Sequence, residues 1–217
     1  DMFQTSQVGL MAYDLTADTV IYAYNERQTL RPASTMKLLT AITALDRFGD
    51  SYRYTTSLKY RGALYDMPSA PAADEDEPRR ILVGDIIAVG GMDPRFGTDD
   101  MKAFAEAVHR ERIDTVYGEV RGDRTFKSAD LLGRGWCWDD DYGPLAAHMV
   151  DGAEGILAAW PEALIKAGIR LNTSMMAEVS GQEGETIVAF AIEHPIAQVM
   201  EPLLKVSDNI YAECLFH

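Results

Sequence analysis

The chain is an acidic polypeptide of ordinary globular composition. Of its 217 residues, 47% are hydrophobic and 25% are charged, which predicts a packed core in one large domain or two ordinary ones. The formal net charge is -14, from 34 Asp and Glu against 20 Lys and Arg, and this balance argues against sequence-independent nucleic-acid binding. No run reaches the roughly 20 continuous apolar residues that a membrane-spanning helix needs.

The first fifty residues predict a hairpin followed by a helix. Val8–Tyr13 and Val20–Tyr24 are short β-prone runs joined by a polar connection, as in two antiparallel strands. Pro32 then ends the extended structure, and Gly49 would stop the helix that follows. The helix is indicated by apolar residues at spacings of three and four, namely Met36, Leu38, Leu39, Ile42 and Leu45.

The middle of the chain predicts an α/β unit. Short strands at 58–61 and 81–89 flank a stretch from Met67 to Pro78 that is rich in Pro, Ala, Asp and Glu, for which we expect an exposed loop. A helical pattern over 99–112 precedes a strand over 115–120. The natural interpretation is a strand-helix-strand unit. Further along, the patterns indicate a helix at 154–167, a strand at 187–192 and a helix at 196–204.

Several features favour structural roles over ligand binding. The Gly90–Pro94 segment lacks the spacing of a phosphate loop and is interpreted as a turn. Three adjacent carboxylates at 139–141 do not converge easily on one cation, so solvated charge is expected. Cys137 and Cys214 are far apart in no zinc-binding pattern, and we expect two buried thiols. The four histidines show no metal-ligand spacing: His109, His148, His194 and His217.

Ser34 and Lys37 form the first candidate catalytic motif. They lie three residues apart in Ser34-Thr35-Met36-Lys37, which on a helix places both side chains on one face. A serine hydroxyl needs a nearby base to become a nucleophile, and a lysine serves as that base when desolvation or neighbouring positive charge favours its neutral form. Taken alone, a Ser-x-x-Lys pattern is more often a helix cap followed by a solvated charge.

A second motif, Ser207-Asp208-Asn209, strengthens the case. It supplies another hydroxyl and an amide between a helical segment and an apolar run, although by itself it would be interpreted as a helix cap or a turn. Together the two motifs match two of the three signatures shared by penicillin-binding proteins and class A β-lactamases.

The ordered series of motifs resembles the D-alanyl-D-alanine carboxypeptidases of peptidase family S13, the class C low-molecular-mass penicillin-binding proteins. The resemblance covers nearly the whole chain. It rests on five segments, Pro32–Lys37, Leu82–Pro94, Tyr117–Asp123, Gly135–Asp140 and Ser207–Glu213.

The resemblance implies a fold of the α/β (α+β) class, a serine β-lactamase/transpeptidase-like domain with an inserted α/β domain. Residues 1–56 and 154–217 would form parts of the penicillin-binding domain, and residues 57–153 the insert. The family's third motif, Lys-Thr-Gly, does not occur before His217, so we expect the catalytic domain to be incomplete at its C-terminus. Between Tyr142 and Ala159 the chain is also shorter than family members.

The resemblance also implies a mechanism. Ser34 would attack the penultimate D-Ala carbonyl of a peptidoglycan stem peptide, Lys37 would take its proton, Ser207 would relay a proton to the leaving amine, and Asn209 would bind the substrate amide. β-Lactams would be trapped as acyl-enzymes. No metal or organic cofactor is implied. The implied location is the periplasm or cell envelope, reached through a removed signal peptide.

Three functions stay open at this point. The first is the carboxypeptidase, with endopeptidase action on cross-links as an open addition. The second is a β-lactamase-like hydrolase with the same nucleophile, which the long insert disfavours. The third is a non-catalytic peptidoglycan-binding protein of the same fold, which the missing Lys-Thr-Gly motif keeps under consideration. The sequence leaves the oligomeric state open.

Overall fold

The computed structural model describes residues 6–67, 78–123, 126, 132–133, 136–137, 143–150, 156–172 and 186–217. Most of the expected loop between Met67 and Pro78, and the acidic cluster at 139–141, lie outside the described residues. Internal contacts divide the chain into two units, residues 1–36 and 37–217. Each unit is described by itself.

The first unit contains the predicted hairpin. Strands β1 (Leu10–Asp14) and β2 (Thr19–Tyr24) pair in antiparallel fashion. The turn between them is closed by the Asp14 carboxylate, whose Oδ1 accepts hydrogen bonds from the backbone N–H groups of Thr16 and Ala17 at 2.8 and 3.0 Å. Such a side-chain-capped turn is the usual role of Asp at a strand end. Both strands were predicted from the sequence to within two residues.

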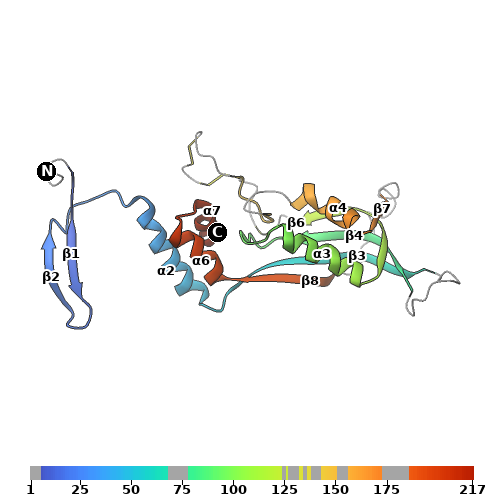
Figure 1. The fold of residues 1–217 in the computed structure, drawn as a ribbon, viewed down its shortest axis with the longest axis horizontal. Coiled ribbons are helices and arrows are strands. Elements are labelled where there is room, and N and C mark those ends of the chain that lie inside the picture. The colour runs from blue at the N-terminus through green and yellow to red at the C-terminus, as the bar shows by residue number, and fades with distance from the viewer. Residues whose placement is uncertain are drawn as a thin grey trace. The chain divides into compact units, whose positions relative to one another are not determined.

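The second unit is built on a six-stranded mixed sheet with the order β7-β5-β4-β3-β8, in which β6 also pairs with β4 (Figure 1). Strands β3, β4 and β8 are mutually antiparallel where they pair, whereas β5 and β6 run parallel to β4. The strands span β3 (Arg53–Asp66), β4 (Arg80–Val89), β5 (Ile113–Tyr117), β6 (Val120–Asp123), β7 (Arg170–Asn172) and β8 (Thr186–Pro195).

The predicted strand-helix-strand unit is confirmed as β4, α3 (Thr98–Arg110) and β5. The strand expected over 115–120 is instead two strands, β5 and β6, which lie one after the other along β4. The break falls where Gly118 approaches the neighbouring backbone, because a Cβ at this position would lie 2.0 Å from the Gly84 carbonyl oxygen. The Glu119 N–H donates to the Asp85 carboxylate at 2.9 Å and so fills the gap between the two strands.

The main hydrophobic core lies between this sheet and helices α3 and α4 (Ile156–Lys166). Aromatic rings stack through it, with the Phe104 ring in edge contact with both Phe96 and Trp160. Helix α4 contacts α3, and it also contacts β6 and β7, so the segment 156–172 packs onto the sheet. Fully buried members of the core are Leu58, Leu82, Ile86, Ala88, Phe96, Phe104, Val108, Val116, Trp160 and Leu164.

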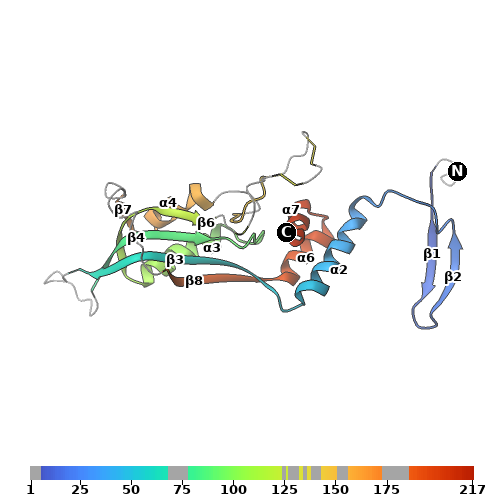
Figure 2. The ribbon, with the colours of Figure 1, turned by 180° about the vertical axis from the view of Figure 1, so that it is seen from behind.

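A separate group of three helices lies at one end of the long strands: α2 (Met36–Phe48), α6 (Ile196–Lys205) and α7 (Asn209–Phe216) (Figures 1 and 2). Strand β8 leads directly into α6, and β3 follows α2 after a short connection. Ala41 and Ala44 of α2 pack in one cluster with buried residues of the other two helices, which are Ile196, Val199, Met200, Leu203 and Leu215. This arrangement brings the starts of α2 and α7 together.

Candidate active site

The site is organised around the amine of Lys37, in the first turn of α2. Its Nζ donates to the backbone carbonyl of Ser207 at 2.9 Å and to the Ser207 hydroxyl at 3.0 Å. A third hydrogen bond runs from Nζ to Oδ1 of Asn209. An ammonium has three donors, and here three neutral oxygens accept from it. The structure thus brings together three of the four predicted site residues, although they are 170 and 172 residues apart in sequence.

The backbone of Ser207 adopts a left-handed conformation, with φ of 61°. This conformation is uncommon for a residue other than glycine, and such residues are concentrated at functional sites. It ends α6 at Lys205 and turns the chain so that both the carbonyl and the hydroxyl of Ser207 meet Lys37.

The middle residue of the second motif has a different role. Asp208 is the N-cap of α7, and its Oδ1 accepts hydrogen bonds from the N–H groups of Ile210 and Tyr211 at 2.8 and 3.2 Å. The helix-cap interpretation therefore holds for Asp208, whereas its neighbours Ser207 and Asn209 direct their side chains to Lys37. The cap fixes the first turn of α7, from which Asn209 projects.

Helix α7 is also anchored at its far end. The buried Tyr54 hydroxyl donates to the Cys214 carbonyl at 3.1 Å, and burial raises the pKa of this phenol far above its ordinary value. The Cys214 thiol is buried, as expected, but Cys137 is exposed, so the expectation of two buried thiols is wrong for Cys137. Trp136 Nε1 donates to the Glu213 carboxylate at 3.3 Å and adds a further tie to α7.

Ser34 lies in the first unit, in a short 3-10 turn, η1 (Ala33–Thr35), that precedes α2 along the chain. Pro32 caps this turn, and its carbonyl accepts hydrogen bonds from both the N–H and the hydroxyl of Thr35, at 3.0 and 2.5 Å. Ser34 is exposed. Its place close to the beginning of the helix agrees with the sequence analysis, and its relation to Lys37 rests on the sequence spacing.

A hollow of about 520 Å³ lies one turn further along α2 and α7. Thr40 follows Lys37 by three residues and Ala212 follows Asn209 by three, so helical periodicity puts both on the faces that carry the site. The remaining lining residues are Glu213, Phe216 and His217. On α2, the large apolar side chains Leu38, Leu39 and Ile42 are more than half exposed, and Ala41 and Ala44 form its buried face.

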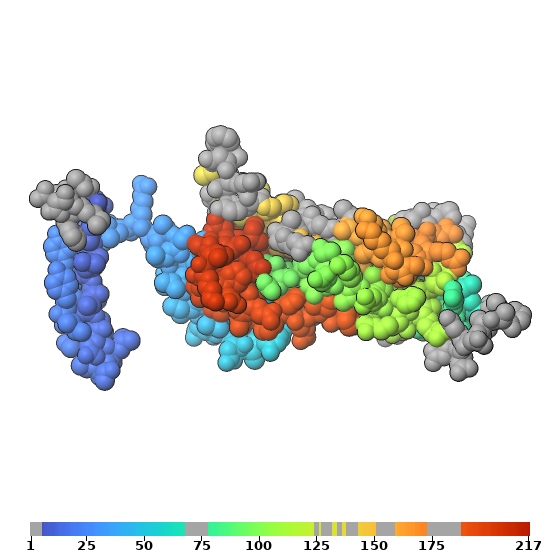
Figure 3. All heavy atoms as spheres, in the orientation of Figure 1, coloured from blue at the N-terminus to red at the C-terminus, as the bar shows by residue number. Residues whose placement is uncertain are grey.

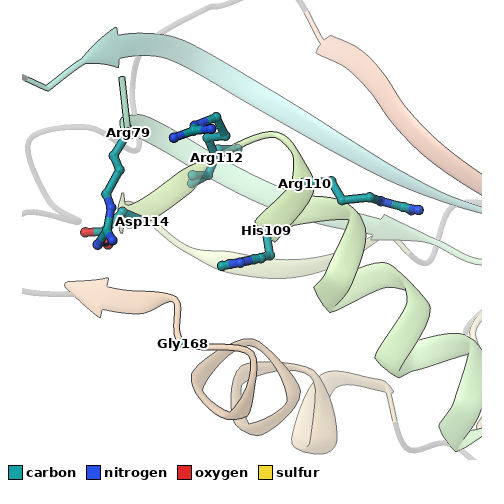
Figure 4. A pocket seen from close by; sticks show the side chains of 7 residues that line it. Arg79, His109, Arg110, Arg112, Asp114 and Gly168 are labelled. Atoms are coloured by element: carbon teal, nitrogen blue, oxygen red, sulfur yellow. Dashed lines mark hydrogen bonds and ion pairs between the residues drawn. The ribbon is translucent and has the colours of Figure 1, made fainter. Parts of the chain in front are cut away.

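A second pocket, of about 320 Å³, lies between the end of α3, the start of β5 and the turn that follows α4, and three arginines are among the residues that line it (Figure 4). Its single carboxylate, Asp114, forms ion pairs with Arg79 at 3.3 Å and with Arg170. Burial opposes ionisation of Asp114, but hydrogen bonds from Arg170 and Thr115 outweigh it and lower the pKa of this carboxyl. None of the predicted site residues lines this pocket.

Comparison with known proteins decides the family. The D-Ala-D-Ala carboxypeptidase 3 (S13) family matches residues 1–153 and 142–217. The chain belongs to the S13 family. The two matches overlap over residues 142–153, within the interval 142–159 that was expected to be shorter than in family members.

Individual relatives agree with this assignment. The D-alanyl-D-alanine carboxypeptidase of Actinomadura sp. (strain R39) is 29% identical over 133 residues, which cover 61% of this chain and 22% of that protein. Among solved structures, penicillin binding protein 4 (dacB) from Haemophilus influenzae matches with a TM-score of 0.73 and 17% identity, over 96% of this chain and 61% of that one. The same protein complexed with a β-lactam matches with a TM-score of 0.61 and 18% identity, over 96% and 59% of the two chains.

The structural matches confirm the predicted fold of the penicillin-binding type. The chain spans about a quarter of the length of the curated relatives that it matches. Among the described residues, no helix is long and apolar enough to span a membrane.

Proposed function

We propose that the protein is a serine D-Ala-D-Ala carboxypeptidase that cleaves peptidoglycan stem peptides through an acyl-enzyme, with Ser34 as its nucleophile. The observation that carries this proposal is the hydrogen bonding of the Lys37 amine to both Ser207 and Asn209, in a chain of the S13 family. These contacts support the proposal because the base, the proton relay and the substrate-binding amide that it requires would be Lys37, Ser207 and Asn209.

The proposed reaction begins with proton transfer from Ser34 to Lys37 in its neutral form, in which the amine has two N–H donors and a lone pair in place of the third donor. Ser34 Oγ forms a bond to the carbonyl carbon of the penultimate D-Ala, and the tetrahedral intermediate collapses with cleavage of the peptide bond. The leaving nitrogen needs a proton at this step. The Ser207 hydroxyl, 3.0 Å from Lys37 Nζ, provides a route by which the proton taken from Ser34 reaches the terminal D-Ala. Water then hydrolyses the ester and releases the shortened peptide.

Asn209 serves both the base and the substrate in this proposal. Its Oδ1 accepts from Lys37 and orients the amine. The substrate contact therefore falls to its Nδ2 group, which donates to a carbonyl of the stem peptide. A β-lactam carbonyl would occupy the same place and leave the enzyme acylated, in keeping with the solved complex of the Haemophilus influenzae protein with a β-lactam.

The same proposal includes the setting of the enzyme. We infer an extracytoplasmic location in the cell envelope, because the substrate is a wall peptide. From the sequence, residues 1–56 and 154–217 are expected to be parts of the penicillin-binding domain and residues 57–153 an insert. Because α4 contacts α3 and β7 pairs with β5, we propose that the insert continues through the segment 156–172.

The proposal is tested with the full-length protein, fluorescent penicillin and a peptide ending in D-Ala-D-Ala. We expect covalent labelling and D-Ala release from the wild type and from a Ser51→Ala control, and neither from Ser34→Ala. Lys37→Met should abolish both reactions, whereas Lys205→Met, which removes an exposed lysine paired with Glu201, should preserve them. Labelling of Ser34→Ala would refute the assignment of the nucleophile, and rapid β-lactam turnover without D-Ala release would favour a β-lactamase-like hydrolase.

A further inference from the structure

The segment Gly90–Arg95, here called the 90–95 loop, lies between the sheet and the helix that carries Asn209. Met92 is fully buried in a cluster with Ile210 and Cys214, two residues of α7. Ile210 directly follows Asn209. In the space-filling view, the red surface of the C-terminal helices adjoins the green surface of the α3 region (Figure 3). The loop therefore supports the first turn of α7 from the side of the sheet.

Asp93 ties the loop to a second element of the site. Its carboxylate is completely shielded from solvent and accepts a hydrogen bond from the Arg95 N–H at 2.9 Å. The same carboxylate lies 2.7 Å from Nδ1 of His194, the residue that precedes Pro195, the N-cap of α6. Asp93 thus fixes the start of the helix whose end leads to Ser207.

Arg95 acts on α7 through its charge. Burial raises the pKa of Tyr211, two residues beyond Asn209, and the nearby guanidinium of Arg95 opposes this rise. Burial raises the pKa of Asp93, although its hydrogen bonds with His194 and the Arg95 N–H oppose the rise. The other ionisable groups that face it are Asp100 of α3 and the phenols of Tyr52, Tyr54 and Tyr211.

The 90–95 loop is itself held from two sides. A Cβ on Gly90 would lie 2.1 Å from the Ala147 carbonyl oxygen, and one on Gly91 would lie 2.5 Å from the Thr55 carbonyl oxygen. The Met92 N–H also donates to Ala147 at 2.7 Å, and Met92 has a left-handed φ of 57°. Because its backbone is closely packed on both sides, the loop cannot shift without displacing the residues that it contacts.

We propose that the 90–95 loop is a positioning element for the catalytic motif, which sets Asn209 and Ser207 in register with Lys37 through Met92, Asp93 and Arg95. This proposal rests on the proposed function. It assigns no contact with substrate to the loop: its residues act through α6 and α7. The alternative is that the loop contributes to stability alone, and Asp85 offers a matched comparison. That buried carboxylate accepts from the Glu119 N–H at 2.9 Å and pairs with Arg121 at 3.0 Å, within the sheet.

The test compares Asp93→Asn with Asp85→Asn in the full-length protein, at a temperature where thermal melting shows both to be folded. The readouts are the second-order rate constant of acylation by fluorescent penicillin, and kcat and KM for D-Ala release. We expect tenfold or slower acylation and a lower kcat for Asp93→Asn, and acylation within twofold of wild type for Asp85→Asn. Equal acylation by the two variants and the wild type would overturn the proposal.

Two further comparisons keep the test decisive if Asp93→Asn does not fold. His194→Asn places an amide N–H close to where the imidazole Nδ1 lies, so it should acylate faster than His194→Ala. Arg95→Gln, which changes an exposed side chain, and Tyr211→Phe should each slow acylation about threefold or more. The double variant should show no additional loss, because both substitutions remove the same interaction. Wild-type rates in Arg95→Gln and Tyr211→Phe, together with equal rates in the two His194 variants, would also overturn it. Failure of the wild type to be acylated at Ser34 would instead refute the proposed function.

Discussion

Replacing Asn209 by alanine removes the contact of Oδ1 with the Lys37 amine and leaves the two Ser207 contacts in place. A hydrogen bond to a charged group contributes about 1.5–3 kcal/mol, and each 1.4 kcal/mol corresponds to about a factor of ten in rate. We therefore expect Asn209→Ala to lower the second-order rate constant of acylation by about 10- to 150-fold if the contact is realised in the transition state. The loss of a substrate contact through Nδ2 would bring the decrease in rate toward the upper end of this range.

The assay follows covalent labelling by fluorescent penicillin over time at several concentrations, with a melting curve to verify folding. Asn209→Asp provides the sharper comparison because it preserves an acceptor for Lys37 but adds a negative charge. A carboxylate beside the amine stabilises the ammonium form, which cannot take the Ser34 proton. We expect Asn209→Asp to be acylated more slowly than Asn209→Ala at neutral pH. Acylation of a folded Asn209→Ala within twofold of wild type would refute the role given to this contact.

Three further predictions concern the framework of the site and the sheet. Asp208→Ala removes the N-cap of α7 and should lower the free energy of unfolding by about 1 kcal/mol in a denaturant titration. It should slow acylation less than Asn209→Ala does. A larger loss of acylation rate than in Asn209→Ala would contradict the division of roles within this motif. Gly118→Ala places a Cβ against the Gly84 backbone and should lower the melting temperature by more than Gly49→Ala does. At Gly49 the space is open, and the left-handed backbone alone costs about 1–2 kcal/mol. The reverse order of melting temperatures would contradict the explanation of the break between β5 and β6. The stabilisation from ionised Asp114 is present above its unfolded pKa of about 4 and is lost as the pH falls through its lower folded pKa. Asp114→Asn should therefore lower the free energy of unfolding at neutral pH and flatten the acid side of the plot of this free energy against pH. An unchanged plot would show that the ion pairs of Asp114 contribute nothing measurable.

Local sequence patterns were sufficient to predict most elements of the fold. Gly49 ends α2 as expected, with a φ of 80°, and Pro202 is accommodated inside α6. The single strand predicted at 115–120 was wrong because its interruption depends on the approach of Gly118 to Gly84, a contact between distant parts of the chain. Periodicity describes one segment at a time and carries no information on such contacts.

The candidate site shows the same limit. The spacing of Ser34 and Lys37 identified a hydroxyl and an amine as candidate catalytic groups. The second motif made this identification more specific, because the two motifs occur together in penicillin-binding proteins. The cap at Asp208 is local to α7 and agrees with the cap interpretation of the sequence, whereas the contact of Asn209 with Lys37 depends on how α2 meets α7. The turn interpretation of Gly90–Pro94 gave no indication of the contact between Met92 and Ile210, because Met92 has no polar group that would mark it as part of a site.

The most direct test of the central claim is the mass of the peptide that contains Ser34 after the full-length protein has reacted with penicillin and been digested. The account predicts one covalent penicillin adduct, located at Ser34, which disappears in Ser34→Ala and persists in Ser51→Ala. An adduct on another residue, or one that survives in Ser34→Ala, would contradict it.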